Sequence, residues 1–195
     1  MSSTAAGGPM TKRPRVDRRS RRVRWSIAVL LVLAVFGAAT ARLFIWPPLA
    51  PLPGHVNAII ELAGPAIDGR DTLALQLARE HRADFLVQST TTSEAGTHNC
   101  LPPVLQVTIL CFHPDPNTTR GEGKYIAAEA ARRGWSSVIL VTTPDQAWRA
   151  RLWTARCYSG DAYVATTPLP LVDWIGQIPY QWGATVKAFT VERSC

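Results

Sequence analysis

Glycine, arginine, amide and hydroxyl-bearing residues recur after the apolar runs of this chain, and together they suit an anionic ligand. Nine residues have this placement: Gly64 and Arg70 after residues 57–63, Asn117, Thr118 and Thr119 after 104–112, and Thr142, Thr143, Gln146 and Arg149 after 136–141. A guanidinium binds phosphate or carboxylate through two parallel hydrogen bonds, and the N–H groups that open a helix also attract anions. The pattern therefore predicts an anion site with Arg70 and Arg149 as its charged clamps.

Two ionisable residues are the candidates for proton transfer. Glu61 interrupts the apolar run 57–63, where a buried carboxylate must face a cleft, pair with an arginine or stay protonated, unless it reaches solvent near the end of the strand. His113 follows the apolar run 104–112. No G-x-G-x-x-G, Walker or G-x-S-x-G motif is present, so the sequence identifies no cofactor and no standard hydrolase mechanism.

The four cysteines form an even set, which in an exported protein indicates disulfides. Of the three possible pairings we expect Cys100 with Cys111 and Cys157 with Cys195. The first pair brackets one short segment, and the second would tie the last residue to a helix end. A metal site is an alternative, because His98 and Cys100 mirror Cys111 and His113, but this spacing is not a standard zinc pattern. Free thiols are the remaining possibility.

The elements that must position these residues alternate between strands and helices. Apolar runs predict strands at 57–63, 83–87, 104–112, 136–141 and 162–165, and helical spacing predicts helices at 71–81, 119–133, 145–157 and 181–191. This alternation is typical of a Rossmann-like α/β fold, with about five parallel strands and helices on both faces. Its ligand crevice lies beyond the carboxyl ends of the strands, where the predicted anion site falls.

The helix at 119–133 has the clearest start and stop signals. Thr119 and Glu122 fit a capping box, in which the hydroxyl caps the helix and the carboxylate reaches back to the capping residue. Gly134 is placed to end the helix.

The first 55 residues predict a membrane-anchored protein. Residues 1–24 form a basic arm expected to be disordered, 25–46 an apolar anchor with Trp25 and Trp46 at the two interfaces, and 47–55 a proline-rich stalk that lifts the domain 56–195 off the membrane. The positive-inside rule places the arm in the cytoplasm and the domain outside. A cleaved signal peptide, with an A-x-A site at 39–41, is the alternative, and it leaves a secreted domain.

The formal charge of +7 does not indicate nucleic-acid binding. Eight of the 21 basic residues lie in the arm, where they abut the apolar run instead of a folded face. The arm therefore points to the lipid membrane as a partner, and the remainder of the chain is close to neutral.

At these motifs the chain resembles the YdcF/SanA/ElyC family of bacterial envelope proteins. The matching pieces are IIELAG at 59–64, Arg70, NTTRGEGKYIAAEA at 117–130, VTT at 141–143 and the segment 146–150. The resemblance covers about residues 56–190 and implies a Rossmann-like domain, often with one N-terminal anchor, that acts in envelope integrity. The chain departs from the family at Asn57, Ala63 and Gln146, which stand where the family has an acid, a glycine and a histidine. If that histidine is a general acid or base in relatives, Gln146 cannot replace it, because an amide does not titrate.

These observations predict a membrane-anchored, extracytoplasmic domain that binds an anionic envelope metabolite. Two alternatives stay open. The first is a non-catalytic structural partner in an envelope-assembly complex, whose protein partners the sequence does not name. The second is a hydrolase or transferase that acts on a peptidoglycan or lipid-carrier precursor.

Overall fold

The computed structural model describes residues 18–64, 69–90 and 100–195. Most of the predicted basic arm, and His98 of the alternative metal site, lie outside these residues. The helices are α1 (Arg18–Thr40), the π-helix η1 (Ala41–Ile45), α2 (Arg70–Arg79), α3 (Thr119–Arg133), α4 (Pro144–Cys157) and α5 (Trp174–Thr190). The strands are β1 (Val56–Glu61), β2 (Ala83–Ser89), β3 (Thr108–Phe112), β4 (Ser137–Thr142) and β5 (Asp161–Thr166).

The five strands form one sheet in the order β3-β2-β1-β4-β5, and every neighbouring pair is parallel. β1 lies at the centre, with Ile60 opposite Val87 of β2 on one side and Leu140 of β4 on the other. The chain moves outward from β1 in one direction through β2 and β3, then returns to the other side of β1 at β4. This reversal is the topological switch point at which such sheets bind ligands.

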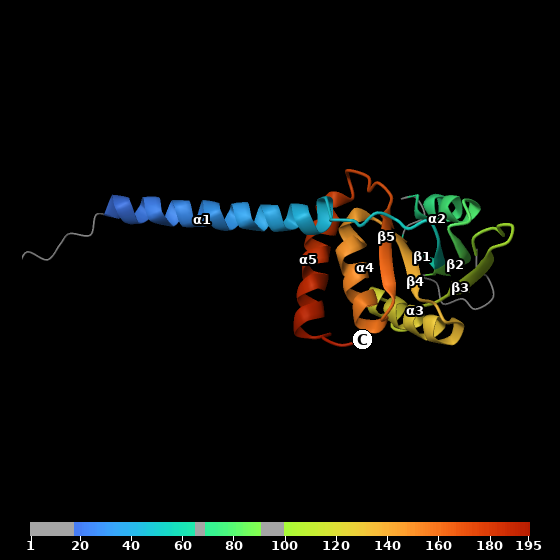
Figure 1. The fold of residues 1–195 in the computed structure, drawn as a ribbon. Helices are drawn as coiled ribbons and strands as arrows, with labels where there is room; N and C mark the ends of the chain where they lie inside the picture. Colours follow the sequence, from blue (N-terminus) through green and yellow to red (C-terminus); the bar gives the residue numbers. More distant parts are fainter. Residues whose placement is uncertain (1–17, 65–68, 91–99) are drawn as a thin grey trace, which may run out of the picture. The chain divides into compact units, whose positions relative to one another are not determined.

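Helices cover both faces of the sheet, as the sequence predicts. Ala74, Leu77 and Ala78 of α2 pack on one face, and Ile126 of α3 and Ala150 of α4 lie among the core residues of the other. In Figure 1, α2 lies above the strands and α3 below them. β1 is apolar along most of its length because both of its faces are buried.

Two elements differ from the sequence-based expectation. β3 begins at Thr108 instead of residue 104, because the chain turns at Gln106, whose φ is 61°, and the Val107 N–H donates to the Val104 carbonyl at 3.1 Å. α5 begins at Trp174, well before residue 181, and includes Pro179. Proline removes one helical hydrogen bond, to the carbonyl of Ile175. Ile175 is 83% exposed, so water can satisfy that carbonyl.

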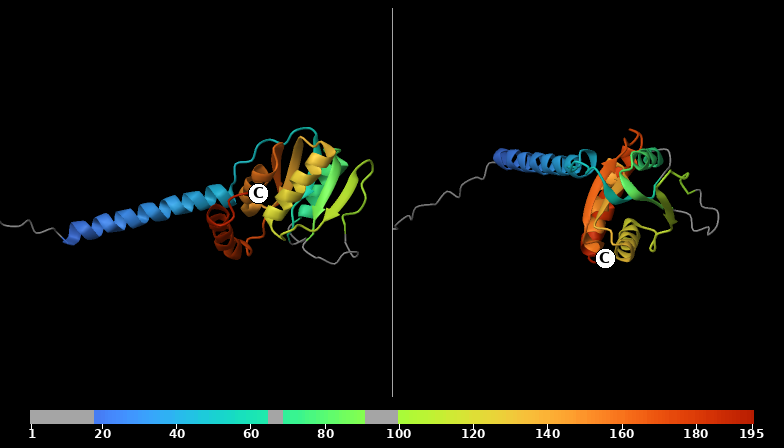
Figure 2. Two further views of the ribbon diagram at one scale, coloured as in Figure 1. Left: turned by 90° about the horizontal axis from the view of Figure 1, so that it is seen from below. Right: turned by 45° about the vertical axis from the view of Figure 1, so that its right-hand side comes forward.

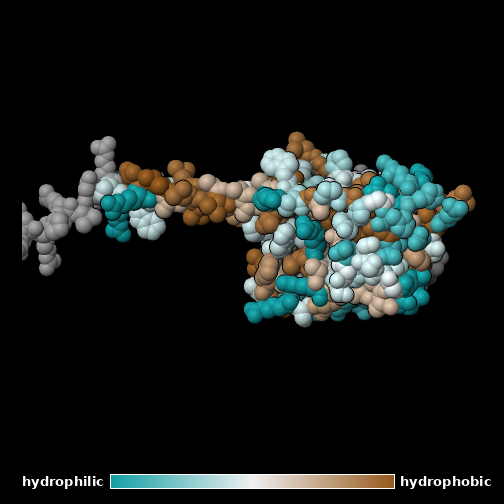
Figure 3. Space-filling model, in the orientation of Figure 1, coloured by the Kyte–Doolittle hydropathy of each residue, from teal (hydrophilic) through white to brown (hydrophobic). Residues whose placement is uncertain are grey.

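The first described residues of the chain form a long helical segment that is mostly apolar. The candidate membrane span covers Ser20–Ile45, 26 residues with only 6% of its apolar window buried. Figure 3 shows hydrophobic residues along this helix, with hydrophilic residues at its N-terminal end. Length and composition suit either a membrane anchor or a signal sequence. The compact units of the chain divide between Ala39 and Thr40.

The last residues of the apolar segment, 40–46, belong to the folded unit. Phe44 is fully buried and meets Trp182 of α5 edge to face, with 5.4 Å between ring centroids. The Trp182 indole N–H also donates to the Thr40 hydroxyl at 3.0 Å. The folded unit therefore starts about 16 residues before position 56, where the end of the proline-rich segment had indicated its beginning.

The proline-rich segment 47–55 lies along the domain instead of forming a stalk. Arg151 donates to the Pro48 carbonyl at 2.9 Å, and Arg82 donates to the Pro53 carbonyl. Leu52 packs against the core on the α2 face of the sheet. Proline fixes the extended backbone, as expected, but leucine and these two carbonyls attach it to the surface.

Both predicted disulfides are present. Cys100 pairs with Cys111, and Cys157 at the end of α4 pairs with Cys195. The cysteine sulfurs are thereby taken up by disulfides and not by a metal ion.

Candidate functional site

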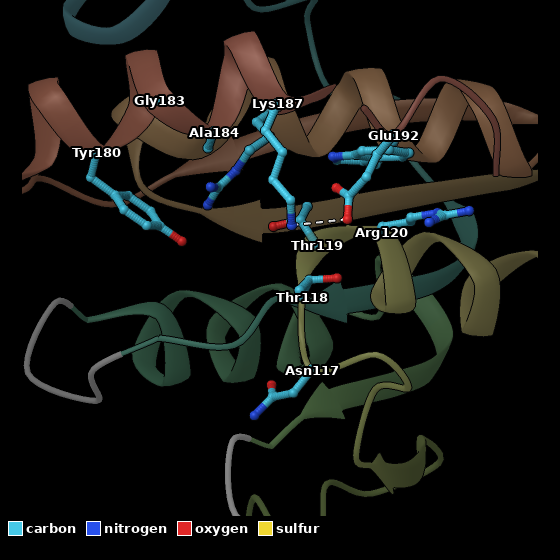
Figure 4. A pocket seen from close by; sticks show the side chains of 11 residues that line it. Asn117, Thr118, Thr119, Arg120, Tyr180, Gly183, Ala184, Lys187 and Glu192 are labelled. Atoms are coloured by element: carbon cyan, nitrogen blue, oxygen red, sulfur yellow. Dashed lines mark ion pairs between the residues drawn. The ribbon is translucent and has the colours of Figure 1, made fainter. Parts of the chain in front are cut away.

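A cleft opens beyond the carboxyl ends of β1, β3 and β4, where the sequence places its anion site. It consists of two adjoining depressions of about 360 and 170 Å³. The two share five lining residues: Asn117, Thr118, Thr119, Arg149 and Tyr180. Figure 4 shows Thr118 and Thr119 on one side of the larger depression, with Tyr180 and Lys187 of α5 projecting toward it from the other.

The start of α3 forms the floor of this cleft, and its cap differs from the prediction. Thr118, not Thr119, is the capping residue, and its hydroxyl accepts from the Gly121 N–H at 3.4 Å. Gly121 is required here because an added Cβ would lie 1.9 Å from the Pro116 carbonyl oxygen. With Thr118 as the capping residue, Glu122 lies one position beyond the capping box.

Glu122 instead turns into the protein and becomes the central ionisable group of the site. It is 4% exposed, and its carboxylate accepts from the Ala63 N–H at 2.7 Å. Burial raises the pKa of Glu122, against the lowering effects of the Ala63 hydrogen bond, the Ser89 hydroxyl, and the positive charges of Arg149 and Arg70. The carboxyl group therefore keeps its proton to a higher pH than an exposed glutamate.

Arg149 is the basic residue that the structure places in the cleft. It lines both depressions, although it is only 7% exposed, and its guanidinium lies 5.1 Å from the centre of the Tyr180 ring. Its Nε is buried and has no hydrogen-bond partner among the described residues. A buried guanidinium donor in this state is suited to bind an anionic acceptor that enters the cleft.

Arg70, the second predicted clamp, has a different position. It is 2% exposed and donates through Nη1 to the carbonyls of Leu62 at 3.0 Å and Ala63 at 2.7 Å. A Cβ on Gly64 would lie 1.2 Å from Nη2 of Arg70, so only glycine leaves room for this guanidinium. Arg70 does not line the cleft. It holds the backbone after β1, including the Ala63 N–H that binds Glu122.

Of the predicted residues around the start of α4, some line the cleft and others do not. Thr142 and Thr143 are 0% and 1% exposed and line neither depression, whereas Gln146 lines the smaller one. The Thr142 hydroxyl donates to the Gln146 side-chain oxygen at 3.2 Å. Thr142 thus orients the amide of Gln146, and of these three residues only Gln146 lines the cleft. Gly64 likewise shapes the site without lining it.

The two candidates for proton transfer also lie outside the cleft lining. Glu61 is 5% exposed at the end of β1, and a His113 ring nitrogen lies 3.0 Å from the Thr90 carbonyl oxygen. Neither residue lines either depression. Glu122 holds the position expected of them. Sequence reasoning missed it because it assigned Glu122 to the helix cap, although the flanking Gly121 and Gly123 were a signal of close packing.

The far wall of the cleft is α5, which several contacts fix to α4. Gln181 is fully buried and donates to the Asp145 carboxylate at 2.7 Å. Arg156 donates to the carbonyls of Ala188 and Glu192, both at 2.9 Å, and the Cys157–Cys195 disulfide joins the ends. Figures 1 and 2 show α5 beside α4, on the side of the domain away from β3.

Among the described residues that line the cleft, basic side chains outnumber acidic ones. Arg120, Arg149 and Lys187 line it together with the acids Glu122 and Glu192. Lys187 pairs with Glu192 at 2.9 Å, an ion pair drawn in Figure 4. A protonated Glu122 would leave Arg149 as the dominant charge at the centre, which favours an anion.

The fold and this cleft together define the class of protein: an α/β domain with a cleft, lined by ionisable side chains, at the carboxyl ends of its parallel strands. Beyond that class, the chain matches no protein-family model, no curated protein and no solved structure.

Proposed function

We propose that this chain is a membrane-anchored, extracytoplasmic domain of the YdcF-like kind, which binds an anionic metabolite of the cell envelope and serves envelope integrity. The observation that carries the proposal is Arg149, whose buried Nε faces no acceptor among the described residues while the side chain lines the cleft. The hydroxyls of Thr118 and Thr119 and the N-terminal end of α3 add donors beside it. A phosphate or carboxylate would satisfy all of these groups.

The proposed location rests on the apolar segment and on the disulfides. Ser20–Ile45 is long enough to span a bilayer, and two disulfides are typical of an oxidising compartment. Cleavage after Ala41 would separate Thr40 from its hydrogen bond with Trp182. The packing of residues 40–46 on the domain therefore favours an uncleaved anchor over a removed signal peptide.

A second candidate function, a hydrolase or transferase acting on a peptidoglycan or lipid-carrier precursor, is favoured by Glu122. This acid has a raised pKa and lies close enough to Arg149 to sense its charge. On a phosphate ester, water would attack phosphorus as the bond to the leaving oxygen breaks. Glu122 would give its proton to that oxygen, and the proton lost by the attacking water would restore it. Arg149 would stabilise the charge on the phosphoryl oxygens.

The test is a binding screen with the full-length chain in a neutral detergent. Inorganic phosphate, sugar phosphates, nucleotides and polyprenyl phosphate would be examined by thermal shift and calorimetry. We expect at least one anion to bind, and Arg149→Gln to weaken it by about 10- to 100-fold, because a hydrogen bond to a charged group contributes about 1.5–3 kcal/mol.

Lys124→Gln is the matched control for this screen. Lys124 is exposed on α3 and does not line the cleft, so the same loss of charge should leave binding unchanged. The absence of binding by every anion would refute the proposal, as would equal losses in both variants. Turnover of a bound ester that Glu122→Gln abolishes without loss of affinity would identify the enzyme.

A further inference from the structure

A second depression, separate from the cleft, lies where the apolar segment joins the domain. It has a volume of about 440 Å³ and is lined by Arg42, Leu43, Pro48, Trp148, Arg151 and Leu152, among others. Arg42 is the basic residue of the π-helix, and Arg151 lies on the outer face of α4. Both arginines are exposed, whereas Leu43, Trp148 and Leu152 are half-buried.

The charges in this depression are unbalanced. Two guanidinium groups share it, and no carboxylate belongs to the described residues that line it. Arg151 donates to the Pro48 carbonyl at 2.9 Å, which uses one of the five N–H groups of its guanidinium. Two cations held side by side repel each other unless an anion lies between them. An anion that binds here therefore gains two charge-assisted contacts.

The position of Arg42 in the chain indicates which anion this is. Ser20–Ile45 has 26 residues, and a helix of that length spans about 39 Å, more than the roughly 30 Å of hydrocarbon in a bilayer. Arg42 lies three residues before the end of this segment, so its guanidinium reaches the level of the lipid phosphates. Trp46, 73% exposed, follows at the depth where tryptophan is enriched.

We propose that this depression binds the phosphate group of an anionic membrane lipid between Arg42 and Arg151. Leu43, Trp148 and Leu152 contact the glycerol and upper acyl carbons of the lipid. The site orients the domain on the outer leaflet, and it is distinct from the cleft of Arg149. The inference rests on the uncleaved anchor but not on the ligand of that cleft.

The experiment is native mass spectrometry of the full-length chain in a neutral detergent, titrated with phosphatidylglycerol or with phosphatidylcholine. The wild type should retain phosphatidylglycerol over phosphatidylcholine. Arg42→Gln and Arg151→Gln should each weaken retention by about fivefold and the double variant by about thirtyfold, the scale expected for one arginine contact at an anionic surface. Arg79→Gln, an exposed arginine on α2 outside the depression, should retain the lipid like the wild type.

Each other outcome overturns the proposal. Equal retention of the two lipids would show that charge does not select the ligand. An equal loss in Arg79→Gln would show a general effect of net charge. Displacement of phosphatidylglycerol by millimolar inorganic phosphate would identify a soluble anion as the ligand. A measured mass equal to that of residues 42–195 would show that the apolar segment is cleaved off, so that no anchor holds Arg42 at the membrane.

Discussion

The carboxyl group of Glu122 gives the cleft a pH dependence that one substitution should remove. Glu122→Gln keeps an oxygen that can accept the Ala63 N–H and abolishes the titration. In the wild type, burial raises the pKa of Glu122, so the group stays neutral at pH values where an exposed glutamate is already ionised. As the pH rises through this raised pKa, a negative charge develops beside the bound anion. Anion affinity should therefore fall with rising pH in the wild type and remain flat in the variant.

The size of this effect follows from Coulomb's law. An ionised carboxylate and a bound anion about 5 Å apart repel each other by about 3 kcal/mol at an effective dielectric constant of about 20. This energy corresponds to a loss of affinity of roughly a hundredfold between the two protonation states.

The assay is isothermal titration of the full-length chain with sulfate, which does not itself change charge between pH 5 and 8. Wild type, Glu122→Gln and the control Glu80→Gln would be compared at four pH values, because Glu80 is an exposed acid on the opposite face of the sheet. Parallel slopes in wild type and Glu122→Gln would refute the reasoning, as would an affinity that rises with pH.

The ionisation of Glu122 also changes the free energy of unfolding, and the difference between its folded and unfolded pKa values sets the direction of this change. The folded-state pKa of Glu122 lies above its unfolded value, so the contribution of the group to stability is complete below the unfolded pKa and is lost as the pH rises through the folded pKa. The wild type should lose free energy of unfolding relative to Glu122→Gln over that window. Urea denaturation without ligand measures this difference.

Two further predictions concern the ends of the domain. Phe44→Ala should cost about 3–5 kcal/mol in urea unfolding, because Phe44 is fully buried, whereas Leu105→Ala, at a residue that is 81% exposed, should leave stability nearly unchanged. Replacing Cys157 and Cys195 together by serine should cost about 4 kcal/mol by the chain-entropy model, because this disulfide has a sequence separation of 38. A loss of less than 1 kcal/mol in the free energy of unfolding would contradict the burial described for Phe44 in the first case and the role of the disulfide in the second.

Much of the fold could be predicted from the sequence because local patterns and tertiary contacts agree there. The apolar runs of β1, β2 and β4 are buried on both faces, and both disulfides join the cysteines that spacing suggested. The start of β3 and of α5 could not be predicted in this way. A turn at Gln106 and a proline tolerated inside an exposed helix depend on context that spacing does not encode.

The structure has a cleft where the sequence predicts the anion site, but several of the predicted residues do not line it. Thr118 and Arg149 line one cleft because each follows a parallel strand, and the carboxyl ends of parallel strands lie at the same edge of the sheet. Arg70 and Glu122 have the reverse of their expected roles, since the arginine is fixed on backbone carbonyls and the glutamate enters the site. Which way each turns depends on close approaches at Gly64 and Gly121, and a sequence gives no distances.

If the apolar segment anchors the chain as proposed, the attachment of residues 47–55 to the domain limits how far the cleft can move from the membrane. Nine free residues would give a tether with a reach of about 30 Å and would let the domain sweep a broad volume above the lipid. Held by Arg82, Arg151 and Leu52, the segment adds no such reach. For an anchored chain, a ligand in the same bilayer would stay at a high effective concentration, while one deep in the cell wall would have to diffuse inward to the cleft.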